Sequence, residues 1–140
     1  MTVVFDASAG AALASPEDDP SHVVESALMN EVCYMTPAAV VAMYVIVHDK
    51  ISKDAAEYWL GFVLSGRDIR LDTSADRELL ESAGEATLIA SNLVSTGCSA
   101  ALAGRLRVQL ITNLPEAAQL EEKGICSIRR FGAKGDFNAS

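Results

Sequence analysis

The hydrophobic residues of the chain fall into short β-branched runs, which are separated by longer segments with helical spacing. Five runs are typical of strands: residues 2–5, 32–35, 67–71, 108–112 and 125–129. Between these runs, apolar residues recur every three or four positions, which predicts amphipathic helices. We expect helices at residues 7–14, 21–29, 38–49, 53–64, 74–95, 99–107 and 115–123. Strands that alternate with helices in this way predict an α/β domain with a parallel sheet.

Two of the predicted helices carry clear start signals. Thr36 is followed by Pro37, and this pair favours a helix start because the hydroxyl can accept a free backbone N–H and proline suits the first turn. Ser21 is expected to cap the helix at 21–29 in the same way. The helix at 38–49 is almost entirely apolar, which predicts burial on most sides. It is either a core helix or an interface with another chain.

The composition indicates one globular domain. The chain has 140 residues, of which 50% are hydrophobic and 21% are charged. We expect a single domain over residues 1–130 and a disordered tail over 131–140, because the tail is polar and contains glycine. The net charge of −8 argues against a sequence-independent nucleic-acid binder, which needs a basic surface. It leaves open an enzyme in which a metal ion supplies positive charge.

The cysteine spacing and the hydropathy of the chain exclude several kinds of site and a membrane span. The three cysteines have no CxxC spacing, which argues against a disulfide framework or a zinc site. Gly97-Cys98-Ser99 lacks the spacing of a nucleophile elbow, so Cys98 is expected to pack against the sheet. No signal peptide is evident, and residues 32–47, the longest uncharged stretch, are too few to span a bilayer. We therefore expect a cytoplasmic protein without a membrane partner.

Polar residues follow the first and the fourth predicted strands. Asp6 and Ser8 come directly after the first strand, and Thr112 and Asn113 end the fourth. Ligands bind at the carboxyl ends of the strands in an open parallel sheet. An aspartate in this position can hold a divalent cation, or it can simply cap the helix that follows. Both interpretations of Asp6 remain open at this point.

Several segments resemble the PIN-domain family, whose best-known small members are the VapC-type toxin ribonucleases. Residues 2–9, TVVFDASA, resemble the family's opening, in which a hydrophobic strand is followed by Asp, then Ala or Thr, then Ser. The order and spacing of further segments also resemble the family over about residues 2–130. These are Thr36-Pro37-Ala38, Arg70-Leu71-Asp72, residues 101–106 (ALAGRL), residues 110–113 (LITN) and residues 124–129 (GICSIR).

The resemblance implies a fold, a cofactor and partners. The fold would be a three-layer α/β/α PIN-like domain with a central, mainly parallel sheet. PIN domains cut RNA with three or four carboxylates that hold Mg²⁺, and the metal activates water and neutralises the phosphate. Mg²⁺ or Mn²⁺ is therefore the implied cofactor. Small family members commonly form homodimers, and the toxins pair with an antitoxin that lays a segment in a groove.

The chain departs from the family at most of the expected acids. The second acid should lie in the helix after Thr36-Pro37, where the matching position holds Ala42 or Met43. The third should lie within residues 95–99, which contain no acid, and the fourth follows Thr112, where the chain has Asn113 and Leu114. Only Asp6 matches clearly. The other residues that could line a polar pocket are neutral: Ser8, Ser95, Thr96, Ser99, Thr112 and Asn113.

Two functions are consistent with this pattern. The first is a PIN-like protein that is impaired or inactive as a nuclease and serves as a binding or assembly module. The alternative is a Mg²⁺-dependent ribonuclease, in which Asp6 is the main metal ligand and Ser8, Thr112 and Asn113 orient water or phosphate. RNA would be a partner only in that case, and other acids would have to complete the site. The acids considered for this role are Glu31, Asp49, Asp54, Glu85 and Glu116. A third interpretation, in which the chain is another kind of Rossmann-like domain, has no support from a nucleotide-binding motif.

Overall fold

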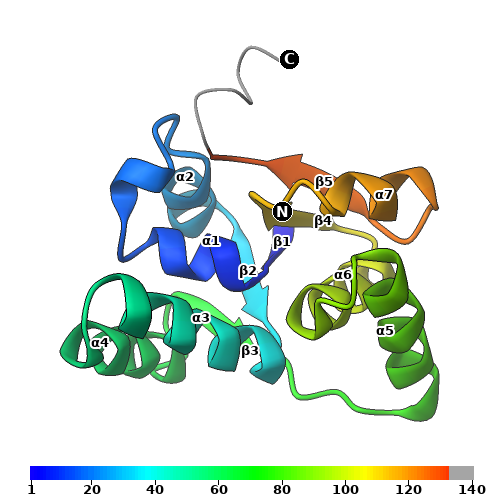
Figure 1. The fold of residues 1–140 in the computed structure, drawn as a ribbon, viewed down its shortest axis with the longest axis horizontal. Coiled ribbons are helices and arrows are strands. Elements are labelled where there is room, and N and C mark those ends of the chain that lie inside the picture. Colours follow the sequence, from blue (N-terminus) through cyan, green and yellow to red (C-terminus); the bar gives the residue numbers. More distant parts are fainter. Residues whose placement is uncertain (133–140) are drawn as a thin grey trace.

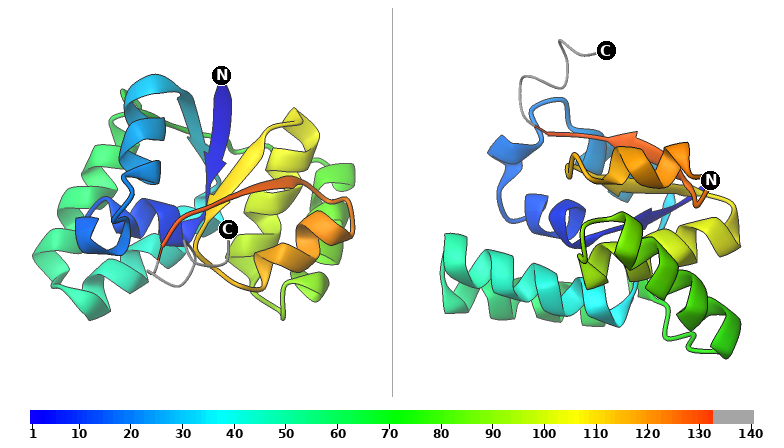
Figure 2. Two further views of the ribbon diagram at one scale, coloured as in Figure 1. Left: turned by 90° about the horizontal axis from the view of Figure 1, so that it is seen from above. Right: turned by 45° about the vertical axis from the view of Figure 1, so that its right-hand side comes forward.

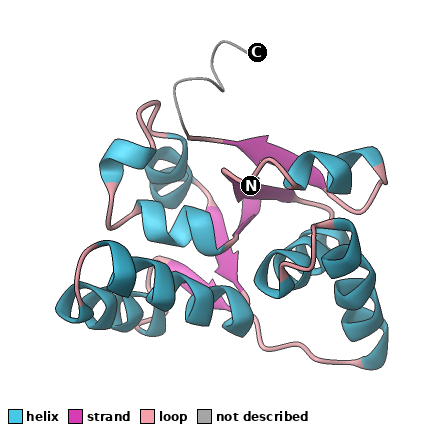
Figure 3. Cartoon of the chain, viewed as in Figure 1, coloured by secondary structure: helices cyan, strands magenta, loops and turns pink. Residues whose placement is uncertain are grey.

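A five-stranded parallel sheet forms the centre of the molecule (Figure 1, Figure 3). The computed structural model describes residues 1–132. All neighbouring strands are parallel, in the order β3-β2-β1-β4-β5. The strands are β1 (Thr2–Phe5), β2 (Val32–Met35), β3 (Ile69–Leu71), β4 (Gln109–Thr112) and β5 (Ser127–Arg130). The predicted α/β class with a parallel sheet is confirmed.

Strand β1 lies in the middle of the sheet and is covered on both faces. Val3 pairs with Cys33 of β2 and with Gln109 of β4. Val3, Val4 and Phe5 are completely buried. Successive side chains of a strand point to opposite faces, so Val3 and Phe5 belong to one core and Val4 to the other. A strand buried on both faces needs such an uninterrupted apolar run.

Helices cover the two faces of the sheet as separate layers (Figure 1, Figure 2). The first layer contains α1 (Ala7–Ala12), α2 (Val23–Asn30), α3 (Pro37–Lys50) and α4 (Lys53–Leu64), with the short 3₁₀ helix η1 (Pro16–Asp18). The second layer contains α5 (Arg77–Ile89), α6 (Val94–Leu106) and α7 (Ala117–Glu122). Within residues 1–132, no helix has the length and apolar character needed to cross a membrane.

The predicted helix at 74–95 is in fact shorter, and the next helix begins earlier than expected. Helix α5 ends at Ile89, and α6 begins at Val94 rather than at residue 99. Ser91 and Asn92 have φ angles of 56° and 64°, a left-handed conformation that a helix cannot contain. The chain therefore reverses here, and α5 packs beside α6 (Figure 1).

The start of α2 also differs from the prediction. Ser21 does not cap this helix. The carboxylate of Asp19 accepts the backbone N–H groups of Val23 and Val24, at 2.8 Å and 2.9 Å. His22 has a φ of 57°, and this turn places Asp19 over the free N–H groups at the start of the helix. Asp19 thus caps the helix in place of Ser21.

Helix α3 is less buried than its sequence predicted. Ala39, Met43 and Val47 face the core, but Val41 is 65% exposed and Val45 is 50% exposed. A helix that is apolar all round is usually buried all round. The exposed apolar side of α3 therefore has no partner within residues 1–132.

The end of the domain lies slightly beyond residue 130. Phe131, which was expected to begin a disordered tail, is 3% exposed and packs in the core on the α1–α4 side. Its backbone N–H donates to the carbonyl oxygen of Thr112 at 3.2 Å. Most of the expected tail, residues 133–140, lies outside the described residues.

Candidate functional site

Asp6 lies at the carboxyl end of β1 and forms the N-cap of α1. Its Oδ1 accepts the backbone N–H of Ala9 at 3.0 Å and the hydroxyl of Ser8 at 2.6 Å. The residue is completely buried. Helix starts leave backbone N–H groups without an intrahelical partner, and an aspartate side chain satisfies one of them. The capping role that the sequence left open for Asp6 is therefore present.

Ser8 connects this cap to the end of β4. Its hydroxyl oxygen accepts the backbone N–H of Asn113 at 3.1 Å and lies 3.5 Å from the Thr112 hydroxyl oxygen. The Thr112 hydroxyl oxygen in turn accepts the backbone N–H of Leu114 at 3.1 Å. The parallel pairing of β1 and β4 places the ends of these strands side by side. Asp6, Ser8, Thr112 and Asn113, which the sequence placed at strand ends, thus form one network.

The environment of Asp6 favours its neutral form. Desolvation by burial raises the pKa of this carboxyl, and the hydrogen bonds that Asp6 accepts, chiefly from the Ser8 hydroxyl, oppose the rise only in part. The second oxygen, Oδ2, is buried and has no hydrogen-bond partner within the described residues. A buried, unpaired anionic oxygen is costly, whereas the protonated carboxyl leaves a smaller penalty.

The residues around Asp6 do not match the donor set that Mg²⁺ or Mn²⁺ prefers. No group of three or more His, Cys, Asp or Glu side chains gathers anywhere in residues 1–132. Of Ala42 and Met43, the two residues that match the expected second acid, Met43 is completely buried in the apolar core, and neither side chain can bind a metal. Hard divalent cations bind charged oxygens and give up water reluctantly, so one carboxyl with neutral hydroxyls is a poor site.

One acid at the same edge of the sheet was not considered from the sequence. Asp72 follows β3, and its Oδ1 accepts the backbone N–H of Ser74 at 2.9 Å. Strand β2 separates β3 from β1, so the backbones at Asp72 and Asp6 are about 10 Å apart if two strand spacings are counted. The Asp72 carboxylate is hydrogen-bonded within its own loop, and within residues 1–132 no third His, Cys, Asp or Glu side chain joins these two acids in a cluster.

Ser95, Thr96 and Ser99 lie in the first two turns of α6. Thr96 and Ser99 are buried, at 2% and 0% exposure. The Ser99 hydroxyl donates to the carbonyl oxygen of Ser95 at 2.9 Å, within its own helix. No hydrogen bond within residues 1–132 links these side chains to the Asp6 network.

The other acids considered for a metal site have other surroundings. Glu31 precedes β2, at the opposite edge of the sheet, and forms an ion pair with an arginine of β5. Asp49 contacts a neighbouring histidine at the end of α3, and Asp54 lies in the first turn of α4. Glu116 is at the start of α7, and Glu85 lies on α5. None of them joins Asp6 in a cluster within the described residues.

Two apolar surfaces lie outside the Asp6 network. The exposed side of α3 carries Val41, Val45 and Ile46. A groove of about 300 Å³ lies between α1, α2 and α4, and we call it the α2–α4 groove. Apolar side chains line most of it, and charged or polar residues of the η1–α2 segment complete it: Leu13, Val24, Leu28, Trp59, Asp19, His22 and Glu25.

Comparison with known proteins finds relatives by structure alone. No family model and no curated sequence matches the chain. VapC20 of Mycobacterium tuberculosis, a toxin that cleaves the sarcin-ricin loop, superposes with a TM-score of 0.66 and 15% identity, over 83% of this chain and 93% of that one. VapBC2 of Rickettsia felis, bound to a fragment of promoter DNA, superposes with a TM-score of 0.65 and 11% identity, over 94% of this chain and 99% of that one. VapBC-5 of Mycobacterium tuberculosis, from a toxin-antitoxin family, superposes with a TM-score of 0.56 and 16% identity, over 94% of this chain and 98% of that one.

These similarities concern the fold. Each neighbouring structure is matched over more than nine-tenths of its length, so the resemblance extends to the whole domain rather than to one motif. The sequence resemblance noted for residues 2–9 and for the segments after them points to the same family of folds. The chain therefore has the PIN-like α/β fold of the VapC proteins.

Proposed function

We propose that this PIN-like protein is impaired or inactive as a nuclease and acts as a binding or assembly module. The proposal rests on one observation, the burial of Asp6 among neutral residues. Its free oxygen is buried without a partner, and neutral residues surround it where a nuclease of this fold needs further acids. RNA cleavage by a metal requires charge at this edge of the sheet, and a single aspartate supplies too little.

The exposed side of α3 supports assembly into a homodimer. Val41 and Val45 are about one helical turn apart, so they lie on one face, and Ile46, about 100° further round the helix, is also exposed. A two-fold interface needs one surface that meets its own copy, and an apolar helix face serves this purpose. Burial of these side chains between two subunits would explain why α3 is apolar all round.

The α2–α4 groove supports a protein partner of the antitoxin type. Its floor is apolar and includes Trp59, an amphipathic side chain of the kind enriched at interfaces. The exposed carboxylate of Glu25 stands beside this floor, and the chain as a whole has a net charge of −8. A helical segment with an apolar stripe and basic flanks is complementary to such a groove. Two of the structural neighbours are toxin-antitoxin proteins by name.

Calorimetric titration of Mg²⁺ and Mn²⁺ into the full chain tests the loss of the metal site. We expect no saturable binding and no cleavage of RNA in the presence of either metal. The Asp6→Asn variant should behave like the unchanged protein, and so should Asp72→Asn. Micromolar binding that Asp6→Asn abolishes would instead support the alternative, a Mg²⁺-dependent ribonuclease in a cytoplasmic toxin-antitoxin pair, and loss of binding in Asp72→Asn as well would make Asp72 a second ligand.

Trp59 provides a probe for the partner groove. Titration with a synthetic helical peptide that has a leucine stripe and lysine flanks should change the tryptophan fluorescence and saturate. Leu28→Glu should weaken this binding, because it places a charge in the apolar floor. The control is Leu88→Glu, at an exposed position on α5 that does not line the groove. Equal weakening by both substitutions would show that the peptide does not use this groove.

A further inference from the structure

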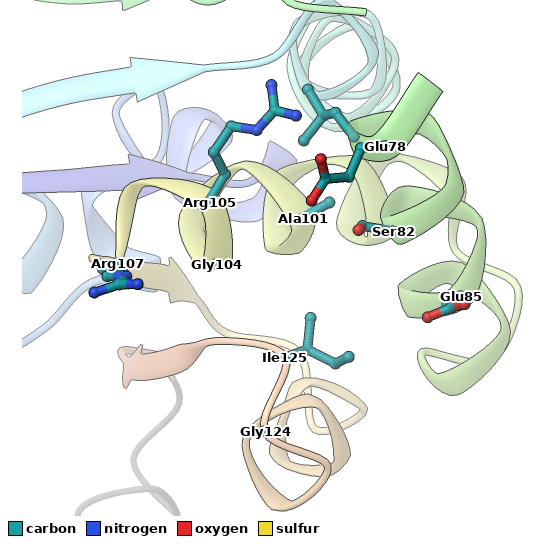
Figure 4. Close-up of a pocket in the computed structure, with 10 residues that line it drawn as sticks. Glu78, Ser82, Glu85, Ala101, Gly104, Arg105, Arg107, Gly124 and Ile125 are labelled. Carbon is teal, nitrogen blue, oxygen red and sulfur yellow. The ribbon is translucent and has the colours of Figure 1, made fainter. Parts of the chain in front are cut away.

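An open polar cavity of about 410 Å³ lies between α5, α6 and the turn that joins α7 to β5 (Figure 4). Arg107, one of its lining residues, comes just before β4, and Ile125 comes just before β5. The cavity is therefore at the amino-terminal edge of the sheet, away from Asp6 at the carboxyl-terminal edge. It is also separate from the α2–α4 groove, which lies on the other helical layer.

Unpaired charges stand at different places around this cavity. Glu78, Ser82 and Glu85 are spaced by four and three residues, which places them on one face of α5. Figure 4 shows these three on the α5 side and Arg107 beyond the end of α6. Glu85 and Arg107 form no ion pair within residues 1–132. Glu78 forms none either, although its charge acts on nearby Arg105.

The second arginine of the lining is already neutralised. Arg105 donates two hydrogen bonds to the carboxylate of Asp76, at 2.6 Å and 2.7 Å. This paired geometry leaves Arg107 as the guanidinium available for an anion within the described part of the lining. The cavity thus offers one free cation at one end and two carboxylates on the α5 wall.

The space between these charges has a firm apolar floor. Ala101 and Gly104 line it from α6, and the Ile125 side chain stands opposite α5 (Figure 4). A Cβ atom added to Gly104 would lie 2.4 Å from the carbonyl oxygen of Ile125, so α6 and the turn are in close contact. Arg107 is the C-cap of α6, and Figure 4 shows Gly104 and Ala101 of that helix between Arg107 and the glutamates of α5.

A ligand complementary to this cavity has an anionic group, an apolar stem and a cationic end. A ligand with only negative charge would be repelled by the glutamates, and a ligand with only positive charge would form no ion pair with Arg107. We propose that the cavity binds a basic amino acid, with its carboxylate on Arg107 and its side-chain cation near Glu85. Glu78 lies about 10 Å from Glu85 along α5, and its charge already acts on Arg105. The methylene groups would then lie over Ala101 and Ile125. A free amino acid and the carboxyl-terminal arginine or lysine of a polypeptide share this chemistry.

Titration of L-arginine into the isotope-labelled full chain, followed by NMR, tests the proposal. The charged side chains are exposed, so each contact is weak and we expect a dissociation constant of about 1 mM. Shift changes should concentrate on α5, the end of α6 and the turn at Gly124. Arg107→Gln should weaken L-arginine about fivefold and leave argininamide, which lacks the carboxylate, unchanged. Glu85→Gln should weaken both ligands about fivefold.

Two further comparisons complete the test. The control variant Arg67→Gln, at an exposed position outside the cavity lining, should leave L-arginine binding unchanged. Nα-acetyl-L-arginine, which lacks the free amino group, mimics the end of a polypeptide. Binding as tight as that of L-arginine would indicate a polypeptide terminus, and weaker binding would indicate the free amino acid. Shift changes scattered over the surface, no saturation well above the expected constant, or equal effects of Arg67→Gln and Arg107→Gln would overturn the proposal.

Discussion

Replacing Gly97 with alanine tests the close contact between α5 and α6. Gly97 lies in the first turns of α6 and directly faces Thr87 of α5. A Cβ atom at this position would lie 2.0 Å from the Thr87 hydroxyl oxygen, 2.6 Å from its backbone nitrogen and 2.7 Å from its Cα. The hydroxyl can rotate away, but the two backbone atoms cannot. The helices would therefore have to move apart.

The size of the effect follows from two opposing terms. Forcing extra atoms into a packed region costs about 1–3 kcal/mol, and contact with backbone atoms places Gly97→Ala near about 3 kcal/mol. The higher helix propensity of alanine offsets about 1 kcal/mol of this cost. We expect a net loss of about 2 kcal/mol. A domain of this size loses about 3 °C in melting temperature per kcal/mol, so the midpoint should fall by about 6 °C.

Gly84→Ala is the matched control. Gly84 lies in α5, and a Cβ atom added there would meet no other atom within 4 Å. The same substitution should therefore stabilise the protein by about 0.5–1 kcal/mol through helix propensity alone. Urea and thermal denaturation followed by circular dichroism measure both variants. If Gly97→Ala proves as stable as Gly84→Ala, α5 and α6 do not approach each other as closely as described.

Three further predictions follow from other contacts. Burial raises the pKa of Asp6, so its contribution to stability is present below about pH 3.8 and is lost as pH rises through the folded pKa. The free energy of unfolding of Asp6→Asn, minus that of the unchanged protein, should therefore grow with pH when both are measured by urea denaturation. A difference that stays constant with pH would contradict this. Arg129 lowers the pKa of Glu31, so that contribution is present above about pH 4.5 and lost as pH falls through the folded pKa. Glu31→Gln should cost about 1–2 kcal/mol at neutral pH and little in acid, and equal costs at both pH values would argue against the ion pair. If the proposed homodimer uses the exposed side of α3, the unchanged protein and the control Leu88→Lys should sediment as dimers and Val41→Lys as a monomer in analytical ultracentrifugation; a dimer that Val41→Lys leaves intact would contradict this.

The parts of the fold that were predictable from sequence depend on local signals. Thr36 accepts the N–H of Ala39, as its place before Pro37 predicted, because capping involves only neighbouring residues. The buried run of β1 was equally evident. The break between α5 and α6 had a weaker signal, since neither glycine nor proline lies between Ile89 and Val94. Ser91 and Asn92 are turn-forming residues, and asparagine tolerates the left-handed conformation that it adopts here, but such residues also occur within helices.

The site was predictable in position but not in its details. Strand ends identified Asp6, Ser8 and Thr112, because parallel strands bring their carboxyl ends to one edge. The direction of each hydrogen bond and the burial of the free Asp6 oxygen depend on three-dimensional packing. The cavity near Arg107 was missed, since its charges come from α5 and from the end of α6. The spacing of Glu78, Ser82 and Glu85 was the one available signal, and it is also typical of an ordinary solvated helix face.

The Asp6 network explains how a PIN-like domain can remain folded at an edge of the sheet that usually carries several acids. Clustered carboxylates repel one another, and a bound cation relieves that repulsion. Here a single carboxyl caps α1, and Ser8 donates a hydrogen bond to this carboxyl and accepts one from the backbone after β4. These neutral hydrogen bonds hold β1 and β4 together without an ion. Under the proposed function, this edge would hold no catalytic metal, and binding would fall to the outer surfaces of α3 and of the α2–α4 groove.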